Sequence, residues 1–403
     1  MSYTPARIIG ALRRRKNDLI RSALYRPASG TGATLRNAVL FEAFDGKVVG
    51  DSPLDIFTAL KQSRPDLEFF WTVKKGVVAP AGSTALKYGS REWLNILATA
   101  KFLVNNSAFP WYFKKVEGQV YLQTWHGTPL KRLVRDIEAG KVSTQYLSTM
   151  RKESAAWDYL ISPSAYATEC FKSAFDFPIK NGSTKSSGRV LEVGYPRNDR
   201  LSASADERVA TRNRVRKQLG VKSEQTQLVL YAPTWRDTNR NAVGTLQTVN
   251  YIDASTKLPK GFQLMYRGHS MTLDAHNSKT ANGAIDVTNY PDITELYLAA
   301  DVLITDYSSV MFDFAVTGKP MIFLAPDIQK YVSDRGFYFD FVAEAPGPIC
   351  DNTAEVMSAL ESIKEAPGEF GKQYAKRYKA WQAKFNPLED GKATARVIAA
   401  VFG

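Results

Sequence analysis

The chain has 403 residues, of which 44% are hydrophobic and 23% charged, and its formal net charge at pH 7 is +13. This length suffices for two domains of ordinary size, and the composition excludes disordered and fibrous classes. No run of 18 apolar residues occurs, so we expect no membrane-spanning helix, and the N-terminus lacks the pattern of a secretion signal. The positive charge indicates an anionic partner: a phosphorylated substrate, a phospholipid surface or a nucleic acid.

Residues 1–36 form a basic segment in which apolar side chains recur at three- and four-residue steps, a pattern that predicts an amphipathic helix. Its basic residues through position 26 are Arg7, Arg13, Arg14, Arg15, Lys16, Arg21 and Arg26, against Asp18 alone. Such a helix either lies on an anionic membrane surface or packs as a solvated helix against the domain. We expect no nucleic-acid partner, because no aromatic-rich recognition motif accompanies the charge.

The next part, residues 37–185, alternates short apolar runs with helical patterns, which predicts a parallel sheet covered by helices. Strands are expected at 38–44, 68–73, 101–106, 120–125 and 158–164. Helices are expected near 53–63, 90–99, 143–157 and 164–174. The polar stretch KNGSTKSSG (180–188) then marks a domain boundary near 180–190.

Residues 186–385 repeat this alternation and are expected to form a second domain. A basic helix at 206–219 precedes strands at 228–233, 262–267, 301–306 and 320–325. Helical patterns occur at 367–384 and in the C-terminal segment 386–403, and these helices could pack on either half. The fold class is therefore α/β with two parallel sheets. Cys170 and Cys350 have neither metal-ligand nor disulfide spacing, which fits a reducing cytoplasm.

Three strands of the second half end in polar clusters: APTWRD (232–237), YRGHS (266–270) and TDYSS (305–309). Open parallel sheets bind ligands beyond the carboxyl ends of their strands, so these clusters predict a binding site. In the third cluster a helix starting near Ser308 would offer its N-terminal N–H groups to a phosphate, with Gly318 ending it. A simple N-cap role for Ser308 is compatible with this.

The donor-side residues predicted from these clusters combine cations, hydroxyls and carboxylates. Arg267 and His269 could neutralise charge that develops on a leaving phosphate, and Arg236 could add a second cation. Asp313 could accept hydrogen bonds from ribose hydroxyls. The predicted donor-binding residues are Thr234, Arg236, Arg267, Asp306, Ser308, Ser309 and Asp313, with His269 as a catalytic residue.

In the first half, TWHGTP (124–129) places His126 at the carboxyl end of a predicted strand. Thr128 and Pro129 have the residue types of an N-cap and a first helical position, and Gly127 permits a tight turn. A histidine near its ordinary pKa suits general-base work, the alternative being an imidazole that only caps a turn. On the acceptor side we expect Glu42, Asn106, Gly127 and Thr128. No carboxylate cluster requires a metal, so neither metal nor cofactor is expected.

With these residues in hand, the chain resembles the CDP-glycerol glycerophosphotransferase family of teichoic acid and capsule synthesis. The resemblance spans roughly 37 to 385 and depends on six stretches in the same order. These are FEAFDGKVVGDSP (41–53), LATAKFLVNNS (97–107), QTWHGTPLKRL (123–133), GYPRND (194–199), APTWR (232–236) and TDYSSVMFDFAVTGKP (305–320). Where the family commonly has a Lys-x-His-Pro element, this chain has Arg267, Gly268, His269 and Ser270, which changes the local loop.

The resemblance implies two Rossmann-like domains facing across a cleft, a GT-B-like architecture. It assigns 37–185 to the acceptor and 186–385 to a CDP-alditol donor, and it maps the motif histidines onto His126 and His269. It also implies a peripheral location on the cytoplasmic membrane face, with a lipid-linked or polymeric acceptor. A sugar transferase with a nucleotide-sugar donor remains an alternative, as does a non-catalytic basic protein that binds membranes or nucleic acid. Glycerol and ribitol, and primase and polymerase, stay undistinguished.

Overall fold

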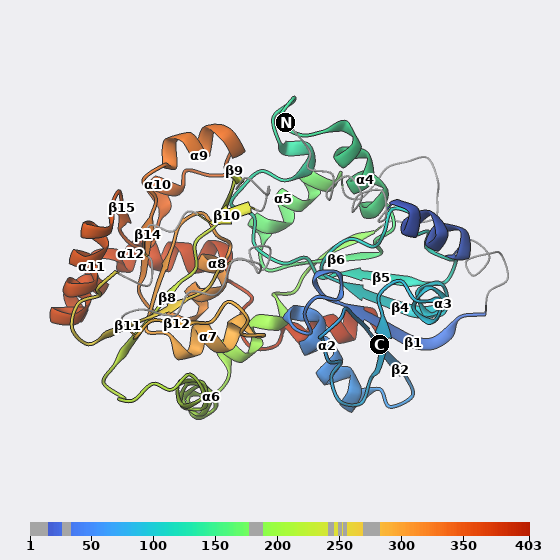
Figure 1. Ribbon diagram of the computed structural model, residues 1–403, viewed down its shortest axis with the longest axis horizontal. Coiled ribbons are helices and arrows are strands. Elements are labelled where there is room, and N and C mark those ends of the chain that lie inside the picture. The colour runs from blue at the N-terminus through green and yellow to red at the C-terminus, as the bar shows by residue number, and fades with distance from the viewer. Residues whose placement is uncertain are drawn as a thin grey trace.

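The computed structural model describes residues 15–25, 34–176, 188–240, 246–248, 252, 256–268 and 283–403. Two lobes lie side by side, each built on its own sheet (Figure 1). Both sheets consist of parallel strands covered by helices, so the expected α/β class with two sheets is confirmed. No helix among these residues has the length and apolar character needed to cross a membrane.

The first lobe contains a seven-stranded sheet in the order β3-β2-β1-β4-β5-β6-β7. Its strands are β1 (Arg36–Glu42), β2 (Glu68–Val73), β3 (Thr84–Lys87), β4 (Ala100–Asn105), β5 (Val120–Gln123), β6 (Tyr159–Ser162) and β7 (Arg189–Glu192). Its helices are α2 (Asp51–Ser63), α3 (Arg91–Thr99), α4 (Thr144–Ser154) and α5 (Ala165–Phe175). Because β7 pairs with β6, residues 189–192 belong to this lobe and not, as expected, to the second domain.

The second lobe contains a six-stranded sheet in the order β12-β11-β8-β13-β14-β15. Its strands are β8 (Gln227–Tyr231), β11 (Phe262–Tyr266), β12 (Ile285–Asp286), β13 (Val302–Thr305), β14 (Met321–Leu324) and β15 (Ile349–Cys350). Its helices are α6 (Ala205–Gln218), α7 (Ile293–Ala299), α8 (Val310–Phe314), α9 (Ile328–Arg335), α10 (Phe341–Glu344), α11 (Thr353–Glu365) and α12 (Pro367–Phe385). The APTWRD stretch leads into a hairpin that the sequence did not predict, β9 (Trp235–Arg240) with β10 (Leu246–Thr248).

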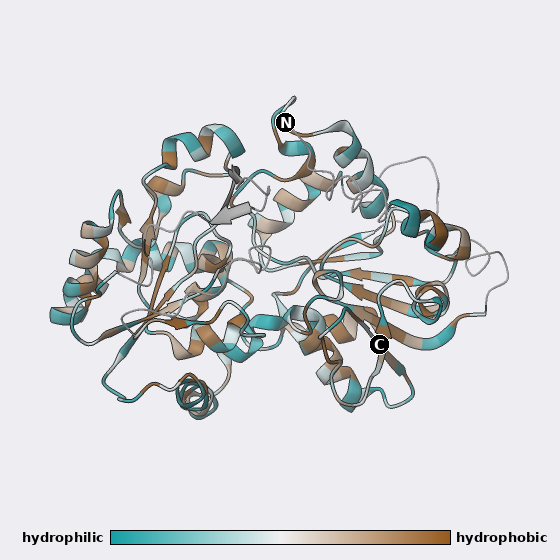
Figure 2. Cartoon of the chain, viewed as in Figure 1, coloured by the Kyte–Doolittle hydropathy of each residue, from teal (hydrophilic) through white to brown (hydrophobic). Residues whose placement is uncertain are grey.

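Alternation along the strands explains why helices cover both faces of each sheet. In β1, Leu40 faces one apolar cluster, which includes residues of α3 and α5, and Val39 and Phe41 face another. The strands of both sheets are accordingly dominated by apolar residues (Figure 2). Cys170 and Cys350 are buried free thiols.

The chain crosses between the lobes twice. The first crossing is a 3-10 segment, η3 (Pro196–Ser202), and the second follows α12. The last helix, α13 (Ala393–Val401), packs on the first lobe beside α2 (Figure 1). There the ring centroids of Phe402 and Phe102 lie 4.8 Å apart. The C-terminal helix therefore completes the lobe that the N-terminal half began.

Candidate active site

The His126 turn follows directly from the end of β5. Trp125 is buried with φ at +52°, a left-handed conformation that costs a non-glycine residue energy, and its ring stacks on His126 at 4.5 Å. The His126 Nδ1 lies 2.8 Å from the carbonyl oxygen of Asn106. Because a carbonyl only accepts, Nδ1 carries the hydrogen and Nε2 keeps its lone pair.

The imidazole of His126 has the electrostatic setting of a neutral base. Its side chain keeps solvent-exposed surface, yet the protein around it desolvates the ring enough to lower its pKa below the ordinary 6.5. The Asn106 carbonyl and Asp51 oppose this shift, and Arg197 reinforces it. At pH 7 the ring is therefore neutral and able to take a proton at Nε2.

No helix begins at Thr128 and Pro129, so this prediction was wrong. Residues 130–133 instead hydrogen-bond to the second lobe, where the Arg132 N–H donates to the Gly336 carbonyl and the Tyr338 N–H donates to the Leu130 carbonyl, both at 3.0 Å. Because these backbone groups are used between lobes, they are not available for helix bonds. The segment after His126 is thereby fixed against the second lobe.

The two predicted clusters approach each other at Gly127 and Ser309. A Cβ atom added to Gly127 would lie 2.6 Å from the Ser309 Oγ and 2.8 Å from its Cβ. Only a residue without a side chain fits there. The turn that carries His126 in the first lobe thus approaches Ser309 of the second lobe through Gly127.

The serine pair begins a short helical segment. Ser309 is the N-cap of α8, and its half-buried side chain makes no capping hydrogen bond, so this hydroxyl is not used to start the helix. Gly318, with φ at +71°, ends the helical run as predicted. Asp306 joins the ends of β8 and β13, because one of its oxygens accepts hydrogen bonds from the Thr234 and Tyr307 N–H groups at 2.8 and 2.6 Å.

Two other predicted donor-side residues have protein partners. The Nη1 atom of Arg267 donates to the carbonyls of Val287 and Tyr290 at 3.0 and 2.8 Å, so this residue anchors a loop. Asp313 is buried and accepts from Arg197 and Asn198 with its two oxygens. His269 lies outside the described residues, as does the side chain of Arg236. Thr234 is buried at the end of β8.

The predicted acceptor-side residues Glu42 and Asn106 are fully buried behind the His126 turn. Burial raises the pKa of Glu42 to about 8, so its carboxyl group is largely protonated at pH 7. Asn106 accepts a hydrogen bond from the Phe44 N–H and donates one to Asp51. Asn106 supports the turn through its carbonyl, which bonds to His126, whereas Glu42 accepts a hydrogen bond from Asn105 in β4. Thr128 is buried as well, and Gly127 is at the lobe contact.

Sequence reasoning assigned no role to Arg197, although it lies within the GYPRND stretch. This residue is only 4% exposed and lies in η3 between the lobes. It makes a two-point contact with Asp313 of the second lobe, at 3.0 and 3.1 Å, and reaches Asp51 of the first lobe at 3.2 Å. These partners are more than 100 residues away in the chain on either side, so no local pattern could reveal them.

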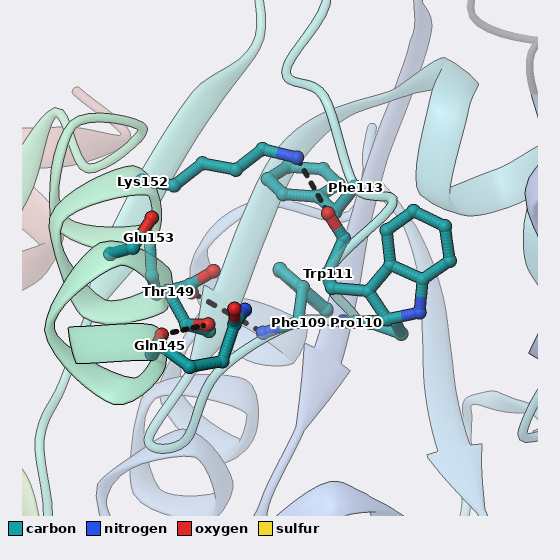
Figure 3. Close-up of a pocket in the computed structure, with 9 residues that line it drawn as sticks. Phe109, Pro110, Trp111, Phe113, Gln145, Thr149, Lys152 and Glu153 are labelled. Atoms are coloured by element: carbon teal, nitrogen blue, oxygen red, sulfur yellow. Dashed lines mark hydrogen bonds between the residues drawn. The ribbon is translucent and has the colours of Figure 1, made fainter. Parts of the chain in front are cut away.

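A hollow of about 210 Å³ lies in the first lobe, between α4 and the loop that follows Asn106 (Figure 3). Gln145, Thr149 and Lys152 of α4 form one wall, and the loop contributes the other, including the half-exposed ring of Trp111. The Lys152 ammonium donates to the Trp111 carbonyl at 2.5 Å. Within the part of the chain that the structure describes, no group of three or more His, Cys, Asp or Glu side chains is arranged to hold a metal ion.

Comparison with known proteins gives relatives that match nearly the whole chain. The chain is 37% identical over 383 residues to a teichoic acid poly(glycerol phosphate) polymerase of Bacillus subtilis, covering 91% of this chain and 49% of the relative. It is 36% identical to a teichoic acid glycerol-phosphate transferase of Staphylococcus aureus, covering 91% and 93% of the two chains. The chain thus spans about half the length of the first relative and most of the second.

A solved structure of the wall teichoic acid polymerase TagF superposes with a TM-score of 0.84 at 32% identity, covering 100% of this chain and 98% of that one. A UDP-GlcNAc 2-epimerase from Neisseria meningitidis shares the fold alone, with a TM-score of 0.52 and 11% identity. These likenesses confirm the GT-B-like architecture. The family model of CDP-glycerol:poly(glycerophosphate) glycerophosphotransferases matches residues 29–403, and the chain belongs to this family.

Proposed function

We propose that this chain transfers glycerol phosphate from CDP-glycerol to a hydroxyl group of a lipid-linked or polymeric acceptor in teichoic acid synthesis. The observation that carries the proposal is the contact between the His126 turn and Ser309, because it joins a neutral imidazole of one lobe to the serine pair of the other. Family membership supports the donor class. Glycerol is preferred to ribitol because three poly(glycerol phosphate) polymerases and a glycerol-phosphate transferase are 35–37% identical. The ribitol-phosphate polymerases and the primases of both kinds are 23–27% identical.

The chemistry is a displacement at phosphorus. The acceptor oxygen forms a bond to the glycerol-bearing phosphorus, the bond from that phosphorus to the bridging oxygen breaks, and CMP leaves with the electron pair. Nε2 of His126 takes the hydroxyl proton. Such transition states are loose, so positioning and charge stabilisation supply most of the rate. Ser308 and Ser309 are the proposed donors to the phosphate oxygens, together with Arg236, Arg267 and His269 as the sequence predicts.

The test is release of the nucleotide leaving group, CMP from a CDP-alditol or UDP from a UDP-sugar, by purified protein supplied with a lipid-phosphate acceptor analogue and one of several donors. CDP-glycerol should give CMP and a product heavier by one glycerol phosphate, and UDP-sugars should give nothing. Turnover of a UDP-sugar in place of CDP-glycerol would favour the sugar-transferase alternative. The absence of turnover with every donor would favour a non-catalytic protein. A parallel assay with chelator tests the expectation that no metal is needed, which strict dependence on added magnesium would contradict.

We further propose that the acceptor approaches from a membrane surface that the N-terminal helix contacts. In the described part of this segment, 15–25, the side chains of Leu19, Ile20 and Leu24 are 57%, 49% and 39% exposed, next to the exposed basic residues Arg15 and Lys16. Exposed apolar and basic side chains together suit an anionic lipid surface.

The same helix packs against the loop that lines the hollow beside α4. The Tyr25 hydroxyl donates to the Lys114 carbonyl at 2.9 Å, and the Tyr25 ring contacts those of Tyr112 and Phe113. This loop forms a wall of the hollow and begins next to Asn106, behind the His126 turn. A lipid-linked acceptor held at this face would therefore lie on the His126 side of the molecule.

Co-sedimentation with vesicles tests the membrane proposal. Phosphatidylglycerol vesicles should bind the protein, and phosphatidylcholine vesicles should bind it weakly. Replacing Leu19 and Leu24 by glutamate should lower binding at least tenfold. Val209→Glu is the matched control, because Val209 is 54% exposed on α6 of the other lobe. Equal binding by the control and the double variant would refute the assignment.

A further inference from the structure

We infer that Arg197 is a positioning residue for the phosphate transfer. It joins Asp313 of the second lobe, which is the proposed donor lobe, to Asp51 of the first lobe. Through Asp51 and Asn106 it also holds the His126 imidazole. The inference depends on the proposed function for the reaction in which His126 acts. Arg197 itself lies in the crossing segment η3.

The contact with Asp313 connects Arg197 to the donor lobe. Nε and Nη2 of Arg197 donate to the two oxygens of Asp313, and Asn198 donates to one of them at 3.0 Å. Asp313 lies on α8, which begins directly after the serine pair. A planar two-point contact of this kind fixes both distance and angle, which a lysine ammonium cannot do. Arg197 therefore fixes the start of α8 relative to the crossing segment.

The contact with Asp51 connects Arg197 to the base. One oxygen of Asp51 accepts from Nη1 of Arg197, and the other accepts from Nδ2 of Asn106, each at 3.2 Å. The carbonyl of the same Asn106 accepts the Nδ1 hydrogen of His126 at 2.8 Å. The contacts thus run from α8 through Arg197, Asp51 and Asn106 to the imidazole, and the Asn106 carbonyl at their end sets its tautomer.

Burial and backbone geometry show that this chain of contacts is built at a cost. Asp51 has φ at +59°, although it is not a glycine, and Phe44, whose N–H donates to Asn106, has φ at +47°. Arg197 is almost fully buried, and its guanidinium stacks over the Tyr195 ring at 4.0 Å. Burial opposes its charge, but the carboxylates of Asp313 and Asp51 raise the pKa of Arg197 further above its ordinary value.

A second arginine in the same segment provides an internal comparison. Arg200 also joins the lobes, with Asp55 of α2 at 3.2 Å and Asp292 of the second lobe at 2.5 Å. Its side chain is 37% exposed, and neither of its carboxylate partners is bonded to Asn106. Losing Arg200 therefore removes an inter-lobe bridge without touching the connection to His126.

Steady-state kinetics of Arg197→Lys, Asp51→Asn and Arg200→Lys test the inference against the wild type. Arg197→Lys keeps the charge and loses the two-point contact, so kcat should fall about 10- to 100-fold, while the KM for CDP-glycerol changes less than threefold. Arg200→Lys should keep kcat within about threefold of the wild type. If the two lysine variants behave alike, Arg197 is only one of two inter-lobe ties and the inference is refuted.

The pH profile separates positioning of the base from a purely structural role. Asp51 and Arg197 are the charged groups that act on the His126 ring. Asparagine tolerates the left-handed conformation of Asp51 and removes its negative charge, which otherwise favours protonated His126. The acid limb of kcat/KM should therefore move to lower pH by about half a unit or more in Asp51→Asn. An unmoved limb in an active, folded variant would refute the connection.

Failure of the underlying function would look different. A wild-type protein that releases no CMP from any CDP-alditol would refute the proposed reaction before any variant is compared. An active wild type whose Arg197 and Asp51 variants keep the wild-type kcat and acid limb would leave the reaction in place and refute only the role of Arg197.

Discussion

Adding one methyl group at Gly127 tests whether the lobes meet where the chemistry is proposed. The Cβ of alanine would lie 2.8 Å from the Cβ of Ser309 and 2.6 Å from its Oγ. The hydroxyl can rotate away, but the Cβ of Ser309 is fixed by its backbone. Ordinary contact begins at 3.4 Å, so Ser309 and the turn must move apart by about 0.6 Å. The φ angle of Gly127 is not positive, so alanine adds no backbone strain.

The magnitude follows from how steeply displacement reactions depend on alignment. A misplacement of about 1 Å costs roughly 100-fold in rate, so a shift of about 0.6 Å should lower kcat by about 10- to 100-fold, equivalent to about 1.4–2.7 kcal/mol. The free energy of unfolding should change by less than about 1 kcal/mol, because the lobes can separate slightly without opening either core. Gly127→Ala should therefore lower activity and leave stability nearly unchanged.

The assay is CMP release from CDP-glycerol, measured for Gly127→Ala, Ser309→Gly and the double variant. Ser309→Gly removes the atoms that the new methyl would strike, so Gly127→Ala should cost little in that background even though Ser309→Gly is itself impaired. Gly371→Ala is the matched control. Gly371 lies within α12 with open space at its Cβ position, so alanine there should leave kcat unchanged. A Gly127→Ala protein with wild-type kcat would refute the contact.

Three further predictions follow from the buried and polar groups described above. His126→Asn should lower kcat at least about 100-fold without changing the melting temperature, and wild-type kcat/KM should fall only below pH 6.5, since the pKa of His126 is lowered from that value. The folded-state pKa of Glu42, about 8 against an ordinary 4.5, means that the folded protein binds this proton more tightly, so stability falls as the pH rises between these values. In Glu42→Gln the decrease in urea-derived unfolding free energy between pH 5 and 8 should be smaller by about 3–4 kcal/mol, and an unchanged decrease would contradict this. The Lys319 ammonium donates to the carbonyls of Tyr297, Leu298 and Ala300, so Lys319→Met should cost about 2–3 kcal/mol of stability while activity per folded molecule stays unchanged.

Much of the fold could be predicted because it depends on local periodicity. The nine expected strands correspond to β1, β2, β4, β5, β6, β8, β11, β13 and β14, with every end within two residues. Short edge strands such as β12 and β15, each two residues long, carry too few residues for a periodic signal. The polar stretch 180–188 precedes β7, a strand of the first sheet, so residues 189–192 could not be assigned to their lobe from local composition.

The site could be predicted only where one segment contains its own signal. Ser309 and His126 each follow the end of a predicted strand, and a glycine lies beside or after each of them. Both signals can be read from the sequence alone. The missing helix after Pro129 shows the limit: the residue types favour a helix, but the second lobe takes up the backbone groups of 130–133. Asp313 and Arg267 have charges that suit a ligand, yet in the structure they bond to other residues of the protein. These partners are brought near by the tertiary fold, which no local sequence pattern encodes.

The position of α13 has a consequence for synthesis of the chain. The face of the first sheet that carries Phe41 and Phe102 is covered in part by Val397 and Phe402, which the ribosome adds after all the strands of the first sheet. A nascent chain can therefore pair β1 to β7 early, but it keeps part of this face open to water until α13 has been synthesised. Fragments that end before Ala393 should for the same reason aggregate, even when they contain every strand of the first sheet.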